Sequence, residues 1–90
     1  MIEREVLVRN RLGLHARAAA RFVNTAARFR SRVTLARDSR RADGKSILGI
    51  LLLAASRGSR LWLEVEGPDE SEAAAALEAL VSGGFGEGAA

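Results

Sequence analysis

The apolar residues of this chain change their spacing several times, from every second residue to every third or fourth residue and back. A spacing of two is typical of a strand with one buried face, and a spacing near 3.6 is typical of an amphipathic helix. The clearest strand pattern covers residues 61–66, where Leu61, Leu63 and Val65 share one face. These changes of period restrict the chain to a fold that combines a sheet with helices.

The same pattern, followed along the whole chain, predicts four strands and three helices. The predicted strands are residues 2–8, 32–36, 40–42 and 61–66, and the predicted helices are residues 16–29, 47–55 and 70–81. The order β-α-β-β-α-β-α predicts an α+β fold, a two-layer open-faced β-sandwich with three helices on one face of a four-stranded antiparallel sheet. The short, charged third strand suits an edge of that sheet.

Two motifs predict where helices begin. Ser46 suits the N-cap of helix 47–55, because a serine hydroxyl accepts a hydrogen bond from a first-turn amide. Asp69 and Glu72 match a D-x-x-E capping box that opens the last helix.

A length of 90 residues suits one domain, which we expect over residues 1–82. Four glycines follow in residues 83–90, and this composition predicts a flexible C-terminal tail. The N-terminus lacks a signal-peptide pattern, and the longest apolar stretch, residues 47–55, is too short to span a bilayer. We therefore expect a cytoplasmic protein without membrane insertion.

Composition excludes several kinds of site. Without cysteine, and with one histidine, the chain has no disulfide framework, thiolate metal site or multi-histidine metal site, so we expect no metal and no cofactor. The net charge is +3, but 11 acidic residues nearly balance 14 basic ones. Because aromatic residues are not interleaved with the arginines, nucleic-acid binding is not favoured.

The only histidine, His15, stands where the first helix is predicted to begin. A neutral imidazole is a nucleophile at physiological pH, and a helix start offers unpaired amides and positive dipole charge. The amides of Ala16 and Arg17 and the Arg17 guanidinium would lie beside the ring. These groups are what a site that accepts and holds a phosphoryl group needs, and a shallow site at a helix end suits transfer between proteins.

Four segments together resemble the HPr family, the histidine phosphocarriers of the bacterial phosphotransferase system. They are Gly13-Leu14-His15-Ala16-Arg17, the helix with Phe22-Val23, Gly44-Lys45-Ser46-Ile47 and Gly67-Pro68-Asp69-Glu70. The resemblance covers almost the whole chain. The residues Asn10-Arg11-Leu12-Gly13 and Ser46-Ile47-Leu48-Gly49 also look somewhat like NPr, the nitrogen-branch relative.

The resemblance implies that His15 accepts a phosphoryl group on Nδ1 from the phosphohistidine of enzyme I and passes it to a histidine of an enzyme IIA. Arg17 and the first-turn amides, Ala16 among them, would steady the phosphate. The protein would then be a stoichiometric carrier and not an enzyme, and we expect a monomer. One residue departs from the family motif, because Ala18 stands where the family has proline. A proline there fixes φ, so its loss bears on transfer efficiency or partner choice.

Helix 47–55 is apolar nearly all round, and a helix on one side of a sheet cannot bury every face. Ile47, Leu48, Leu51 and Leu52 are predicted to form a docking surface for enzyme I and enzyme IIA, with Ile50 and Leu53 in the core. In the HPr of many bacteria the serine that matches Ser46 is phosphorylated by an ATP-dependent kinase, which makes Ser46 a candidate regulatory site.

The alternative function is a regulatory module that binds another protein through Ser46 and the apolar helix. A third hypothesis, a small nucleic-acid binder that uses the arginines, predicts an affinity that depends steeply on salt. Trp62 lies on the outward phase of its strand, and we assign it no function.

Overall fold

The computed structural model describes residues 1–87, and in this part of the chain the predicted order of strands and helices is confirmed. The elements are β1 (Ile2–Leu7), α1 (Ala16–Ala26), β2 (Arg32–Arg37), β3 (Arg40–Asp43), α2 (Ile47–Leu52), β4 (Arg60–Glu66), α3 (Glu70–Ser82) and the short 3-10 helix η1 (Gly84–Gly86). The helices α1 and α2 end earlier than predicted, at Ala26 and Leu52. Within residues 1–87, no helix is both long enough and apolar enough to cross a membrane.

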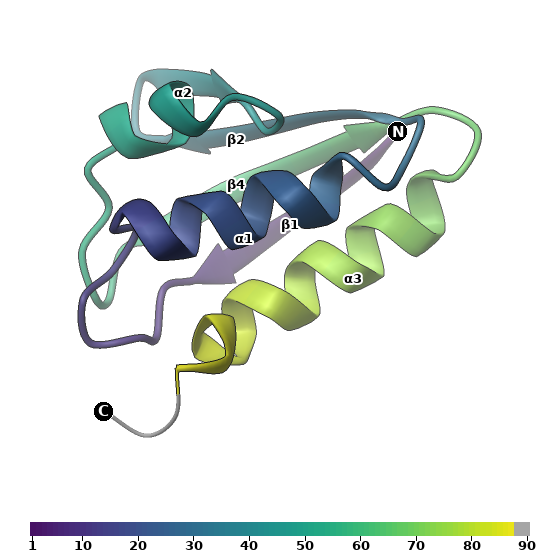
Figure 1. Cartoon of the computed structure of the whole chain (residues 1–90). Helices are drawn as coiled ribbons and strands as arrows, with labels where there is room; N and C mark the ends of the chain where they lie inside the picture. The colour runs from purple at the N-terminus through teal and green to yellow at the C-terminus, as the bar shows by residue number, and fades with distance from the viewer. Residues whose placement is uncertain (88–90) are drawn as a thin grey trace.

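The strands form one antiparallel sheet in the order β1-β4-β2-β3 (Figure 1). Because β4 pairs with both β1 and β2, its inward side chains lie in the middle of the core. Leu61, Leu63 and Val65 are each at most 1% exposed, as their alternation predicts. The polar strand β3 lies at an edge of the sheet, which also agrees with its sequence.

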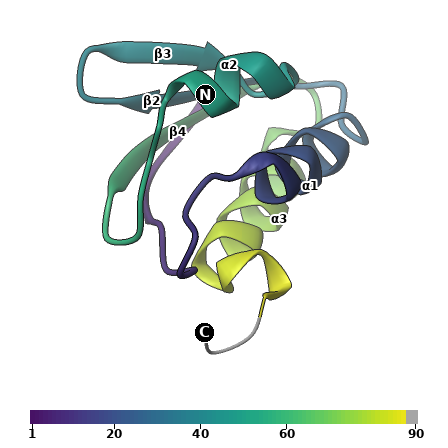
Figure 2. The same cartoon turned by 60° about the vertical axis from the view of Figure 1, so that its left-hand side comes forward.

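The helices lie together on one face of the sheet, with α1 between α2 and α3 (Figures 1 and 2). Along α1 the buried stripe has the predicted helical spacing, and Ala19, Phe22 and Ala26 are fully buried. The opposite side of α1 is exposed and carries Arg17, Arg21 and Asn24. The predicted α+β two-layer architecture is therefore confirmed.

The other face of the sheet is polar and open to solvent. Trp62 is 39% exposed on this face, and its indole N–H donates to Oε1 of Glu3 at 3.2 Å. Arg41 of the edge strand pairs with the Glu64 carboxylate across the same surface. Trp62 therefore covers the back of the sheet, on the side away from the helices.

The capping box predicted at the start of α3 does not form, and this corrects the interpretation of Asp69. Asp69 occupies the N-cap, but its side chain makes no capping hydrogen bond. Its carboxylate instead accepts from the Ser31 hydroxyl at 2.5 Å and from the amides of Arg30 and Ser31 at 2.9 and 3.0 Å. Because Ser31 is completely buried, its hydroxyl and its amide need an acceptor from the protein, and Asp69 reaches both of them.

Residues 83–87 are also not a frayed tail, which corrects the prediction for this part of the C-terminal segment. After α3 the chain turns into η1 and inserts Phe85 into the core, where it is 1% exposed. Phe85 has a φ of +57°, a left-handed conformation that costs about 1–2 kcal/mol. Complete burial of a phenylalanine side chain contributes about 1.5–3 kcal/mol and offsets that cost. The predicted tail residues 88–90 lie outside the described residues.

Candidate functional site

Gly13 sets the approach of the chain to the candidate site. Its φ is +66°, and a Cβ atom at this position would lie 2.4 Å from the carbonyl oxygen of Ala55. Glycine alone combines this left-handed conformation with such a close approach. The next residue, Leu14, donates its amide to the same carbonyl oxygen at 2.9 Å. The loop before His15 is thereby fastened to the segment that follows α2.

His15 occupies the N-cap of α1, as the sequence predicts. Its backbone is extended, with φ −72° and ψ 176°, and its carbonyl accepts the first helical hydrogen bond, from Ala19 at 2.9 Å. The ring nitrogen Nδ1 accepts a hydrogen bond from the amide of Arg17 at 3.2 Å. Nδ1 therefore faces the first turn of α1, where the amides of Ala16 and Arg17 lack acceptors within the helix.

The other ring nitrogen of His15, Nε2, lies against the Oε2 atom of Glu87. Because Nδ1 is an acceptor, the proton of the neutral ring is on Nε2, and Nε2 donates to Glu87. The second carboxylate oxygen, Oε1, accepts from the side-chain amide of Asn10 at 3.0 Å. Burial disfavours the charged carboxylate, but the hydrogen bonds from Asn10 and His15, together with the positive charge of Arg17 and of the His15 ring when it is protonated, outweigh this effect and hold the pKa of Glu87 below its ordinary value.

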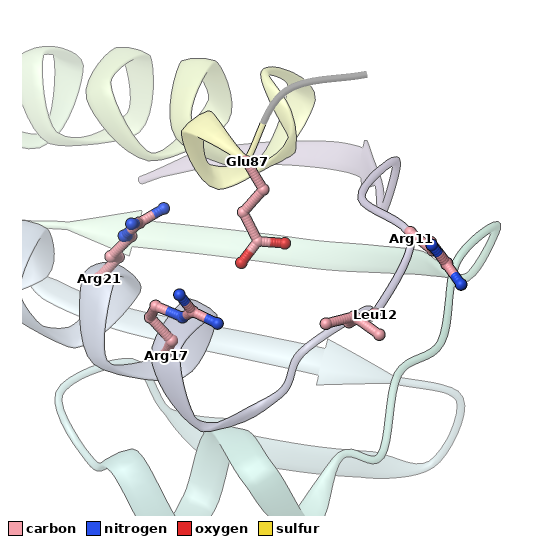
Figure 3. A pocket seen from close by; sticks show the side chains of 5 residues that line it. All are labelled: Arg11, Leu12, Arg17, Arg21 and Glu87. Carbon is pink, nitrogen blue, oxygen red and sulfur yellow. The ribbon is translucent and has the colours of Figure 1, made fainter. Parts of the chain in front are cut away.

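Beside the ring lies a cavity of about 300 Å³, and Figure 3 shows the five side chains that line it. Three of them are arginines, and the others are an apolar residue and the carboxylate that contacts His15. The lining residues are Arg11, Leu12, Arg17, Arg21 and Glu87. Arg17 and Arg21 extend from α1 toward the Glu87 carboxylate, which enters from the C-terminal segment (Figure 3). An excess of guanidinium groups over carboxylates suits the cavity to an anion with several oxygen atoms.

The side chains of Asn10 and Arg21 hold the C-terminal segment over this cavity. Asn10 is 1% exposed, and its amide also donates to the carbonyl of Gly13 at 2.6 Å, so it joins the loop before His15 to Glu87. Arg21 donates to the carbonyl oxygen of Phe85. The sequence interpretation missed Asn10, Arg21 and Glu87 as parts of the site. The one available signal was Phe85, an aromatic residue within a glycine-rich segment.

The apolar helix α2 lies beside α1. Its predicted docking residues differ in exposure: Ile47, Leu48 and Leu52 are 44%, 67% and 60% exposed, whereas Leu51 is partly buried against the core. The predicted core residues of this segment, Ile50 and Leu53, are 0% and 1% exposed. An exposed apolar surface therefore exists where the sequence predicts it, and we call Ile47, Leu48, Leu51 and Leu52 the α2 patch.

Both ends of α2 are capped by side chains. At the start, the Ser46 hydroxyl accepts from the amide of Gly49 at 3.1 Å, which confirms the predicted N-cap. At the end, Arg37 donates to the carbonyls of Leu53 and Ala54, each at 3.0 Å, and Arg40 donates to the carbonyl of Leu52 at 2.9 Å. These contacts, and a φ of +52° at Ala54, end the helix before the predicted residue 55.

Ala18, the departure from the family motif, lies in the first turn of α1 and is completely buried. An amide in this turn has no acceptor within the helix, so the extra N–H disturbs no helical hydrogen bond. The replacement of proline by alanine leaves His15 at the N-cap and Arg17 at the cavity.

Comparison with known sequences places this chain in a defined family. Residues 2–83 match a family model described as the PTS HPr component phosphorylation site. The chain is 49% identical over 88 residues to the phosphocarrier protein HPr of Cupriavidus necator, a match that covers 98% of this chain and 99% of the relative. It is 46% identical over 88 residues to the phosphocarrier protein HPr of Neisseria meningitidis serogroup A, with the same coverage of 98% and 99%.

Solved structures agree with this similarity. The crystal structure of HPr-C-His from Thermoanaerobacter tengcongensis has a TM-score of 0.93 to this chain at 44% identity and covers 97% of this chain and 98% of its own. A structure described as an HPr dimer from the same organism has a TM-score of 0.77 at 44% identity and covers 97% of this chain and 100% of its own. The expectation that this chain is a monomer stays a prediction.

Proposed function

This chain belongs to the HPr family of phosphocarrier proteins of the phosphotransferase system, and on that premise we propose that it takes a phosphoryl group from enzyme I onto Nδ1 of His15 and gives it to an enzyme IIA. The observation that carries the proposal is the position of Nδ1. This nitrogen bears a lone pair, faces the first turn of α1 and lies on a side chain that is 21% exposed. A phosphoryl donor on another protein can therefore reach it.

The surroundings of His15 suit a site that binds a phosphoryl group but still lets it move to another protein. Oxygens of a group on Nδ1 would replace the ring as acceptors for the amides of Ala16 and Arg17, at the positive end of the α1 dipole. The Arg17 guanidinium lines the adjoining cavity and would neutralise part of the phosphoryl charge. The site is open on one side, so this stabilisation stays moderate, and the group keeps its tendency to move to the next protein.

We assign docking of enzyme I and enzyme IIA to the α2 patch. Exposed leucine and isoleucine side chains lie beside the helix that carries His15, and apolar surface of this kind marks protein interfaces. Arg37 and Arg40 fix the C-terminal end of α2, so the patch presents a pre-formed surface to its partners.

Ser46 gives the same surface a second proposed role, in regulation by a kinase. It is half-buried at the start of α2 and directly precedes Ile47 of the α2 patch. A phosphate on Ser46 would be favoured by the helix N-terminus but would place negative charge next to an apolar docking surface. Phosphorylation would therefore leave the fold intact and weaken docking.

Phosphoryl transfer from phosphoenolpyruvate and enzyme I tests the carrier function. We expect one acid-labile, hydroxylamine-sensitive phosphoryl group per chain and no labelling of the His15→Ala variant. An acid-stable adduct, or undiminished labelling of His15→Ala, contradicts the proposal.

The docking assignment has its own control within the chain. Leu48→Ala should raise the KM for enzyme I, because it removes the most exposed side chain of the α2 patch. Leu7→Ala is the matched control, since Leu7 is 37% exposed on β1 and should leave the KM unchanged. Equal KM values for the two variants would contradict the assignment of enzyme I docking to the α2 patch.

A further inference from the structure

The Glu87 carboxylate has a separate partner for each of its oxygen atoms. Oε2 accepts from Nε2 of His15, and Oε1 accepts from the buried side-chain amide of Asn10. The segment that carries Glu87 is anchored by the buried Phe85 ring and by the hydrogen bond from Arg21 to the Phe85 carbonyl. The carboxylate is therefore held in place against the ring, although His15 and Glu87 are 72 residues apart in sequence.

We propose that Glu87 is a positioning residue for phosphoryl transfer, which keeps the proton of His15 on Nε2 and thereby leaves Nδ1 unprotonated, with the lone pair that attacks phosphorus. The inference rests on the proposed function of His15. An imidazole proton can occupy either nitrogen, and the tautomer is set by the hydrogen bond that the other nitrogen makes. Here the acceptor at Nε2 and the donor at Nδ1, the Arg17 amide, favour the same tautomer.

The transfer step follows from this tautomer. The Arg17 amide transfers its hydrogen bond from Nδ1 to a phosphoryl oxygen. The lone pair of Nδ1 then forms a bond to phosphorus, while the bond between phosphorus and the donor nitrogen of enzyme I breaks and leaves its electron pair on the donor ring. Nε2 keeps its proton, so the phosphorylated ring carries a positive charge next to the Glu87 carboxylate, which stabilises it. When the phosphoryl group moves on, His15 departs as a neutral imidazole and not as an anion, which keeps it a good leaving group.

The negative charge of Glu87 does not oppose the entry of phosphate. The carboxylate contacts the ring at Nε2, on the side away from Nδ1, and Arg11, Arg17 and Arg21 line the same cavity. Three guanidinium groups against one carboxylate leave the cavity attractive to the incoming group.

Two variants separate the parts of this role. Glu87→Gln is nearly isosteric with the wild-type side chain, but it offers one oxygen atom to two donors, the Asn10 side-chain amide and Nε2 of His15. When that oxygen accepts from Asn10, the N–H groups of the new side chain point toward Nε2 of His15. Glu87→Ala removes both contacts. The matched control is Glu78→Gln, because Glu78 is a carboxylate on α3 that is 43% exposed and pairs with Arg4 at 4.0 Å.

The direct readout is NMR of the imidazole nitrogens of unphosphorylated protein at alkaline pH, where the ring is neutral. In wild type and Glu78→Gln we expect the Nε2–H tautomer and an Nε2 proton signal shifted downfield by the carboxylate. In Glu87→Gln and Glu87→Ala we expect that signal to be lost and the share of the Nδ1–H tautomer to rise. The rate of phosphoryl acceptance from enzyme I should fall roughly tenfold, the scale of a lost hydrogen bond to a charged group.

Unchanged tautomer populations in both Glu87 variants overturn the proposal, whether or not the rate falls, because a rate loss alone would then have another cause. A wild-type chain that accepts no phosphoryl group refutes the proposed function instead. The tautomer comparison needs no enzyme I, so the two failures are distinguishable.

Discussion

Replacing Gly13 by alanine tests how the chain delivers His15 to the start of α1. A Cβ atom at this position would lie 2.4 Å from the Ala55 carbonyl oxygen and 2.9 Å from Cα of Ser56. Both obstacles are backbone atoms, so no side-chain rotation can relieve the contact. The loop must move away from the segment after α2, and the hydrogen bond from Leu14 to Ala55 lengthens or breaks.

Three terms set the size of the effect. The left-handed φ of +66° costs an alanine about 1 kcal/mol, overpacking costs about 1–3 kcal/mol, and the lost hydrogen bond costs about 1 kcal/mol. The lower entropy of the unfolded alanine chain returns about 0.5 kcal/mol. We expect Gly13→Ala to lower the free energy of unfolding by about 3–4 kcal/mol, which lowers Tm by about 15–20 °C in a domain of this size.

Gly58→Ala separates the conformational term from the steric term. Gly58 also has a left-handed φ, +90°, but a Cβ atom there would meet no atom within 4 Å. Its replacement should cost only about 0.5–1 kcal/mol. Urea denaturation followed by far-ultraviolet circular dichroism measures both variants. Equal losses of stability for Gly13→Ala and Gly58→Ala would refute the steric reasoning, because the two positions share the conformation and differ in the contact.

Three further predictions concern stability and regulation. Ala54→Gly should raise the free energy of unfolding by about 0.5–1 kcal/mol, because Ala54 has a φ of +52°, which glycine adopts without strain. The control Ala75→Gly, at an exposed position within α3, should lower the free energy of unfolding by about 1 kcal/mol. A loss of stability for both variants in thermal unfolding would contradict the interpretation of Ala54. Hydrogen bonds from the Ser31 hydroxyl and the Arg30 amide hold the pKa of Asp69 below its ordinary value of 3.8, so its contribution to stability is present above that value and is lost as the pH falls through the lower folded pKa. The stability gap between wild type and Asp69→Asn, measured by urea denaturation, should therefore be wider near neutral pH than in strong acid, and a gap independent of pH would contradict this. Ser46→Asp should preserve stability, because aspartate also caps helices, but it should slow phosphoryl transfer from enzyme I. Ser46→Ala should lower the free energy of unfolding by about 1 kcal/mol and leave the rate of transfer unchanged. Slower transfer in Ser46→Ala with unchanged transfer in Ser46→Asp would contradict the regulatory role.

The parts of the fold that could be predicted from sequence are those with a strong local signal. The alternation in β4 and the helical stripe of α1 predict which side chains are buried, and the structure confirms both. The N-cap positions of His15 and Ser46 were predictable for the same reason, because capping depends on residues within one helical turn.

Long-range contacts explain where the predictions failed. The D-x-x-E pattern at Asp69 is a valid local signal, but the Asp69 carboxylate accepts hydrogen bonds from Ser31 and from the Arg30 amide instead of capping α3. Helix α2 is shorter than its apolar run because two arginines of the β2–β3 hairpin donate hydrogen bonds to the carbonyl oxygens at its end. Arg37 donates to Leu53 and Ala54, and Arg40 donates to Leu52. Neither partner is visible in a local window of sequence.

The C-terminal part of the site could not be predicted for a related reason. A segment rich in glycine has little local preference for structure, and glycine content alone predicts a flexible tail. The burial of Phe85 reverses that preference and brings Glu87 to His15. Phe85 is buried only in the folded chain, where η1 packs against both α1 and α3.

NMR of the protein after phosphorylation by enzyme I, with labelled histidine nitrogens, tests at the reacting atom whether His15 is the phosphoryl carrier. Coupling between phosphorus and a ring nitrogen identifies the atom that holds the phosphoryl group. We expect coupling to Nδ1 of His15, with the proton retained on Nε2 beside Glu87. Coupling to Nε2, or a phosphoryl group on any other residue, would contradict it.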